Sequence, residues 1–204
     1  MNRDHKIKLV EEFAAENMDQ HDGGHDWWHL HRVRNTAMHI IASEGSGDPL
    51  IVEISALLHD IGDSKFRNAA TSNTSLLLGD FLGSLGLDKC IIREVIFINL
   101  NISFSKGNRP EQVSREFMIV QDADRLDAIG AIGIARAFNY GGFRNNVIYD
   151  PTGVSPSTIA HFNDKLLKLQ DLMNTETGRR LSDERHNFIE SFLIQFNKEW
   201  NGPV

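Results

Sequence analysis

An apolar run that ends in a histidine and an aspartate constrains this chain more than any other feature. Between Leu50 and Ile61 nearly every residue is apolar, and the run closes with His59, Asp60 and then Gly62. Such a run, stopped by glycine, is typical of a buried helix with a glycine C-terminal cap. Burying an imidazole and a carboxylate costs free energy unless another group pairs them. A divalent metal ion is one such partner, so we ask which other motifs meet this helix end.

The composition is that of an ordinary globular protein and argues against two classes of partner. Of the 204 residues, 41% are hydrophobic and 24% are charged, which suffices for one substantial core. A formal net charge of −7 argues against a nucleic-acid or anionic-membrane binder. The single cysteine, Cys90, cannot form an internal disulfide, and no apolar run approaches membrane-spanning length. We therefore expect a cytoplasmic protein with a small-molecule partner, and a homodimer is compatible with the sequence.

Helical periodicity recurs along the chain, whereas no segment keeps the alternation of a strand. The pattern predicts helices over about residues 4–18, 26–43, 50–61, 74–85, 88–99, 111–138, 157–173 and 182–200. The longest irregular stretch lies between Tyr140 and Pro156. We expect one all-α domain over residues 1–204, with a motif core at about 25–140 and C-terminal helices at about 157–200 packed on it.

Potential metal ligands fall in three places on separate predicted helices. They lie within residues 25–32, 59–63 and 122–127. Asp124 and Asp127 are three residues apart and share a helix face, and we expect this face to continue through Ala128, Ala131 and Ala135. Imidazole and carboxylate ligands from three helices would form a mixed nitrogen and oxygen site, which suits Mn²⁺, Fe²⁺, Co²⁺, Ni²⁺ or Mg²⁺. Because Cys90 has no cysteine partner, a structural zinc site of thiolates is not expected.

Each of these places also has a simpler interpretation. A His-Asp dipeptide occurs by chance in many proteins. The carboxylates of Asp122, Asp124 and Asp127 are compatible with a solvated helix face that pairs with Arg125. The apolar surroundings of that helix weigh against the second interpretation, since a carboxylate among apolar neighbours is usually buried and partnered.

Three short strings follow one another in a fixed order: His29-x-x-Arg32-Val33, then His59-Asp60-Ile61-Gly62, then Ala123-Asp124-Arg125-Leu126. Over roughly residues 25–140 this set resembles the HD superfamily of metal-dependent phosphohydrolases, and its short bacterial members most. The resemblance implies that one divalent metal ion, with Mn²⁺ favoured, is bound by His29, His59, Asp60 and Asp124.

The resemblance also implies roles for residues around the metal. Asp63 falls where some relatives carry an acidic residue that activates water, so Asp63 and the ligand Asp60 are the expected catalytic residues. We expect contacts with a phosphorylated substrate from six further residues: His25, Arg32, Lys65, Arg125, Asp127 and Arg144.

The expected activity is metal-dependent hydrolysis of a phosphoric ester or anhydride in a nucleotide. The loop at 140–156, which carries Arg144, favours a nucleoside triphosphate cleaved to monophosphate and pyrophosphate, because the loop offers room for a longer phosphate chain. The alternatives are a nucleoside 5′-monophosphate phosphatase, a non-catalytic nucleotide sensor and a di-iron oxidoreductase. The last would need more ligands than the sequence offers.

Overall fold

The computed structural model describes residues 1–18, 26–62, 74–102 and 110–202. Within these ranges there is no strand, only an isolated bridge between Val147 and Ser157, so the predicted all-α fold is confirmed. No helix among them has both the length and the apolar character needed to cross a membrane. The helices are α1 (Arg3–Asn17), α2 (Trp27–Glu44), α3 (Pro49–Leu58), α4 (Thr74–Ser84), α5 (Lys89–Asn101), α6 (Arg115–Asp127), α7 (Gly130–Phe143), α8 (Thr158–Asp164), the 3-10 helix η3 (Leu166–Leu172) and α9 (Glu176–Trp200).

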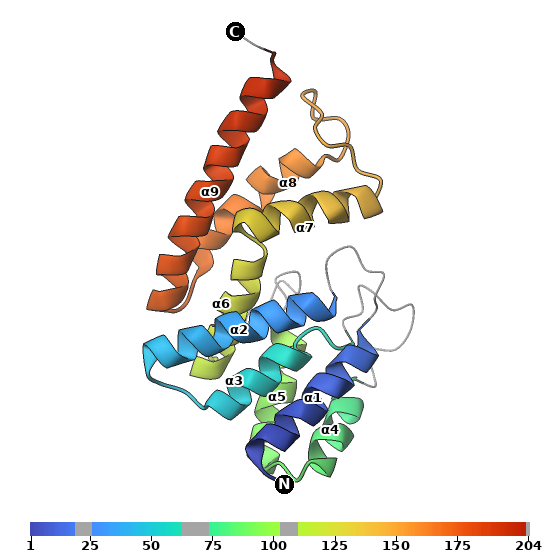
Figure 1. Ribbon diagram of the computed structural model, residues 1–204, viewed down its shortest axis with the longest axis vertical. Coiled ribbons are helices and arrows are strands. Elements are labelled where there is room, and N and C mark those ends of the chain that lie inside the picture. The colour runs from blue at the N-terminus through green and yellow to red at the C-terminus, as the bar shows by residue number, and fades with distance from the viewer. Residues whose placement is uncertain (19–25, 63–73, 103–109, 203–204) are drawn as a thin grey trace.

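Two groups of buried apolar side chains form the core. The first joins α1, α4 and α5 to one side of α3 and includes Leu57 and Leu82. The second joins α6, α8, η3 and α9 and includes Phe117 and Phe162. Helices α2 and α3 contribute to both groups. Figure 1 shows α6 running between the lower helices and the upper group of α7, α8 and α9. Because α2 packs against both α3 and α6, residues of these three helices are brought together.

The central apolar helix ends earlier than the sequence predicted. Helix α3 stops at Leu58, and His59 follows it in the turn as the C-terminal cap residue. Gly62 does not cap this helix but turns the chain with a φ of +77°. A Cβ atom at this position would overlap the hydroxyl of Thr74 at the start of α4, so both the backbone and the packing require glycine. The His-Asp pair therefore lies in a turn, anchored by a buried helix on one side.

The helix predicted over about 111–138 is in fact two helices. Helix α6 begins at Arg115, where Ser114 caps it, and ends at Asp127. Helix α7 begins at Gly130, whose φ of +73° is a left-handed conformation that interrupts an α-helix. The expectation that the face of Asp124 continues over the alanines of the next turns is therefore wrong. The break leaves Asp127 in the last turn of its helix.

The C-terminal helices also differ from the predicted bounds. The helix expected at 157–173 is divided at Lys165, whose φ of −133° and ψ of −54° separate α8 from η3. Helix α9 starts at Glu176 rather than at 182, because the side chain of Thr175 caps it by accepting a hydrogen bond from the backbone N–H of Gly178.

Candidate metal centre

The cluster of histidines and aspartates is assembled from three elements. His29 lies in the first turn of α2, where the carboxylate of Asp26 accepts a hydrogen bond from its backbone N–H at 2.8 Å. His59 and Asp60 occupy the turn after α3, and Asp124 lies in the last turn of α6. The cap at Asp26 fixes where α2 begins, so it also fixes the position of His29 relative to the other two elements.

The carboxylates of Asp60 and Asp124 lie within 3.7 Å of the Nε2 atoms of His29 and His59. The Nε2 atoms of His29 and His59 lie 3.2 Å apart. Carboxylate oxygens of Asp60 lie 3.3 Å and 3.5 Å from these two nitrogens, and Oδ1 of Asp124 lies 3.5 Å and 3.7 Å from them. Both imidazoles are buried, whereas the Asp124 side chain is 30% exposed. The cluster is therefore accessible from the side of Asp124.

The hydrogen bonds made by Nδ1 of His29 and of His59 determine the tautomer of each ring, and so which nitrogen presents a lone pair to the cluster. Nδ1 of His59 lies 2.8 Å from the carbonyl oxygen of Ala56, and Nδ1 of His29 lies 2.8 Å from Oδ2 of Asp127. A carbonyl and a carboxylate only accept, so both Nδ1 atoms carry the hydrogen. Two Nε2 lone pairs and two carboxylates then point at one place. This donor set fits a divalent transition metal.

The charges of the cluster favour a cation at its centre. Burial lowers the pKa of His59, but the carboxylates of Asp60 and Asp124 outweigh burial and raise this pKa to about 9. Burial raises the pKa of Asp124, but a hydrogen bond with His59 and the charges of both histidines bring it below its usual value. A proton on His59 and a bound metal ion therefore compete for the same negatively charged place.

This competition predicts a pH dependence for metal binding. Below the His59 pKa of about 9, a metal ion has to displace the imidazole proton. We therefore expect the apparent Kd for Mn²⁺ to fall by about tenfold per pH unit between about pH 6 and about pH 8. Calorimetric titration in buffers of different ionisation enthalpy measures both the affinity and the proton release. An affinity that stays constant over this range, without proton release, would contradict the prediction.

A buried amide supports the turn that carries two of the converging side chains. Nδ2 of Asn99, on α5, donates toward the carbonyl oxygens of Leu58, His59 and Ile61 at 2.7, 3.2 and 3.1 Å. These carbonyls belong to the last residue of α3 and to the turn that follows it, where helix ends leave carbonyl groups in need of donors. The sequence reasoning missed Asn99. The available signal was an amide between Ile98 and Leu100, in the apolar part of α5.

Asp127, expected as a substrate contact, is only 4% exposed and lies behind His29. Besides the hydrogen bond from His29, it accepts one from Nε of Arg32 at 2.7 Å, one from Nη2 of Arg32 at 2.9 Å and one from Nη1 of Arg136 at 2.8 Å. Burial raises the pKa of Asp127, but these hydrogen bonds bring it well below its usual range. Arg136, on α7, was not predicted as a site residue.

Comparison with known proteins identifies the family. The family model of the HD domain matches residues 27–129, a stretch that contains all four converging side chains. The chain belongs to the HD-domain family. The resemblance noted in the sequence is thereby confirmed.

Relatives in this family are similar over nearly the whole chain. The uncharacterized protein YpgQ of Bacillus subtilis is 43% identical over 181 residues, which cover 88% of this chain and 86% of YpgQ. A crystal structure of YpgQ in complex with ADP aligns with a TM-score of 0.84 at 36% identity, covering 98% of this chain and 97% of that one. An HD-superfamily hydrolase of Bacillus thuringiensis aligns with a TM-score of 0.81 at 38% identity, covering 98% and 100%. The chain therefore has the fold of an HD-superfamily hydrolase.

Of the remaining predicted site residues, the structure describes Arg32, Arg125, Asp127 and Arg144. His25, Asp63 and Lys65 lie outside the described residues. Arg125 is buried, donates to the carbonyl oxygen of Leu172 through Nη1 and lies 4.0 Å from Asp122. Arg144 is exposed at the C-terminal end of α7. Of the predicted substrate-binding residues that the structure describes, Arg32 and Asp127 are the two that lie beside the cluster.

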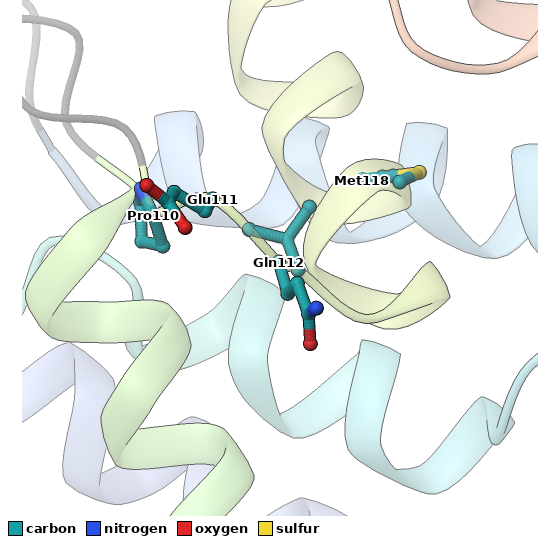
Figure 2. A pocket seen from close by; sticks show the side chains of 5 residues that line it. Pro110, Glu111, Gln112 and Met118 are labelled. Atoms are coloured by element: carbon teal, nitrogen blue, oxygen red, sulfur yellow. The ribbon is translucent and has the colours of Figure 1, made fainter.

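Two hollows on the described part of the surface are separate from the metal-site cluster. One, of ≈ 600 Å³, lies beside the start of α6, and Figure 2 shows residues that line it: Pro110, Glu111, Gln112 and Met118. The other, of ≈ 210 Å³, lies between α7 and α8 beside Tyr140 and His161. The four converging side chains line neither of these hollows.

Proposed function

We propose that this chain is a metal-dependent phosphohydrolase that cleaves a nucleoside triphosphate to the monophosphate and pyrophosphate in the cytoplasm. The observation that carries the proposal is the convergence of His29, His59, Asp60 and Asp124, from three elements, within the fold of an HD-superfamily hydrolase. These four side chains would hold one divalent metal ion, for which we favour Mn²⁺. When bound, the metal supplies a Lewis acid that lowers the pKa of water and offsets phosphate charge.

Two guanidinium groups beside the cluster support an anionic substrate. Arg32 and Arg136 both pair with Asp127, and both side chains are partly exposed. One carboxylate offsets one of two positive charges, so the three side chains keep a net positive charge. Donors that are not directed at Asp127 remain for phosphate oxygens, which arginine binds well. Such a surplus of charge favours a polyphosphate over a neutral substrate.

An exposed aromatic ring supports a nucleotide rather than a simple phosphate ester. Trp28 precedes His29 on α2 and is 61% exposed. It lies four residues before Arg32, so the two share one helix face. A solvent-exposed indole is a surface on which a nucleobase can stack. The crystal structure of the relative YpgQ in complex with ADP also supports a nucleotide as the ligand.

The family resemblance supplies the proposed general base. Asp63 would position the attacking water and accept its proton, while His25 and Lys65 would contact the phosphates. We expect Asp63→Asn to keep the metal bound but to lower kcat by about 10²-fold or more, because the amide cannot accept a proton at neutral pH. Metal content and steady-state kinetics measure both quantities. If Asp63→Asn turns over at the wild-type rate, the base has to be another group.

The decisive experiment is a panel of nucleotides and phosphoesters incubated with Mn²⁺, Mg²⁺, Co²⁺ and Ni²⁺ separately. Chromatography of the products distinguishes pyrophosphate, expected from a triphosphate, from orthophosphate, expected from a monophosphate phosphatase. Addition of a chelator should abolish either activity. Full hydrolysis by a demonstrably metal-free sample would refute the mechanism. A bound nucleotide that stays intact in the presence of Mn²⁺ would instead identify a sensor.

A further inference from the structure

We infer that Asp127 is a positioning residue that holds His29 as a metal ligand, and that it does not contact the substrate. The inference rests on the proposed metal site. It assigns to Asp127 a different role from the substrate contact expected from the sequence. Two properties of Asp127 carry the inference: how its oxygens are occupied, and which nitrogen of His29 it selects.

Donors of the protein itself already engage both oxygens of Asp127, with three hydrogen bonds at Oδ2 and one at Oδ1. A carboxylate accepts about four hydrogen bonds. Asp127 accepts four, one from His29, two from Arg32 and one from Arg136, at distances between 2.7 and 2.9 Å. It is also almost fully buried. A negatively charged group in this position would repel a phosphate rather than bind it. Asp127 lies behind the His29 imidazole and holds this ring in its orientation.

The hydrogen bond between Asp127 and His29 selects the tautomer that a metal needs. Because the carboxylate only accepts, it fixes the hydrogen on Nδ1 of His29, so the Nε2 lone pair of His29 lies on the side of the cluster, 3.2 Å from Nε2 of His59. A carboxylate behind a ligand histidine also makes the imidazole a stronger donor to the metal. His59 has a neutral carbonyl in the equivalent place, that of Ala56. His29 should therefore depend on its support more than His59 does.

The two arginines that bind the Asp127 carboxylate come from different helices, Arg32 from α2 and Arg136 from α7. Arg32 lies one turn after His29 on α2, so the side chains of His29 and Arg32 both donate to the carboxylate of Asp127 on α6. Arg136 comes from α7 and also donates to the backbone carbonyl of Asp127 at 3.3 Å. The support thus joins α2, α6 and α7 at one residue. A substitution of Asp127 should change the geometry of the metal ligand, and not only the local charge.

Glu53 provides a matched control within the same molecule. It is 5% exposed, against 4% for Asp127, and it also accepts hydrogen bonds from two arginines. Arg3 donates to it at 2.6 Å and Nε of Arg34 at 2.9 Å. Both carboxylates are thus buried and paired with arginine, but only Asp127 is bonded to a proposed metal ligand. A loss of stability alone should affect both variants, whereas a loss of metal affinity should affect only one.

The test compares Asp127→Asn with Glu53→Gln by calorimetric titration with Mn²⁺. We expect Asp127→Asn to bind Mn²⁺ about 10- to 100-fold more weakly, and Glu53→Gln to stay within about twofold of wild type. Spectra of ¹⁵N-labelled histidine, with the His29 signal assigned by its loss in His29→Gln, should show the Nδ1–H tautomer in wild type and its loss or mixing in Asp127→Asn. Should Asp127→Asn fail to fold by circular dichroism, Arg136→Gln carries the test, and we expect it to bind Mn²⁺ more weakly than wild type and Glu53→Gln do.

The outcomes separate this inference from the proposed function. If wild type does not bind Mn²⁺, the proposed metal site itself is wrong. If wild type binds Mn²⁺ and Asp127→Asn binds it equally well, with a raised KM, Asp127 contacts the substrate and the inference is overturned. Equal losses of affinity in Asp127→Asn and Glu53→Gln would also overturn it, because the effect would then follow from stability alone.

Discussion

Asp124→Ala is expected to abolish metal binding and to reduce hydrolysis to the background rate. Asp124 supplies the converging carboxylate that is most exposed, and its Oδ1 atom lies within 3.7 Å of both histidine nitrogens. Removing it leaves one carboxylate, that of Asp60, to balance a divalent ion between two imidazoles. A site of this kind loses most of its affinity when an anionic ligand is lost. Metal content per chain and the rate of nucleotide hydrolysis measure the two effects directly.

The same variant should lose the stabilisation that the metal provides. Wild type at a Mn²⁺ concentration of about 100 times Kd should gain about 2.7 kcal/mol of unfolding free energy, whereas Asp124→Ala should gain none. The melting temperature with and without Mn²⁺ measures this difference. Asp164→Ala, an exposed aspartate on α8, is the control and should respond to Mn²⁺ like wild type. A full complement of metal in Asp124→Ala would refute the proposed ligand set.

Local signals in the sequence predicted the start of α2 and the presence of a buried helix before His59. Asp26 predicts the start of α2, and the structure confirms that its carboxylate caps the helix and holds the first turn around His29. The apolar run before His59 predicts a buried helix, which α3 is. Capping and periodicity depend on residues that are near one another in the chain, so they can be read without knowledge of the fold.

The remaining features depend on contacts between residues far apart in the chain. The break before α7 was missed because Gly130 lies among small and apolar residues, a composition that also suits a continuous, closely packed helix. The bond between His29 and Asp127 joins residues 98 positions apart. The roles of Asn99 and Arg136 likewise arise from tertiary packing of α5 and α7. A sequence pattern indicates which residue types are present, but not which backbone carbonyl or carboxylate they will meet.

Asp122→Ala is expected to destabilise the protein strongly while leaving the metal bound. Asp122 is two residues from Asp124, about 200° away around a helix of 3.6 residues per turn, so its side chain cannot face the same cluster. The structure shows a fully buried carboxylate that accepts hydrogen bonds from the residues preceding α9. The backbone N–H groups of Asn174 and Thr175 donate to it at 2.9 and 2.7 Å, and the Thr175 hydroxyl at 2.8 Å. Asp122 therefore anchors the start of α9.

Removing this carboxylate leaves buried donors without their acceptor, and Thr175 can no longer be held in place to cap α9. We expect a loss of about 3 kcal/mol or more of unfolding free energy, measured by urea denaturation. Metal content should stay at the wild-type value when it is measured in conditions where the variant is folded. Thr175→Ala removes the cap while keeping the carboxylate, and it should cost about 1 kcal/mol. If Asp122→Ala lost the metal and kept its stability, Asp122 would be the metal ligand. The roles proposed for Asp122 and Asp124 would then both be wrong.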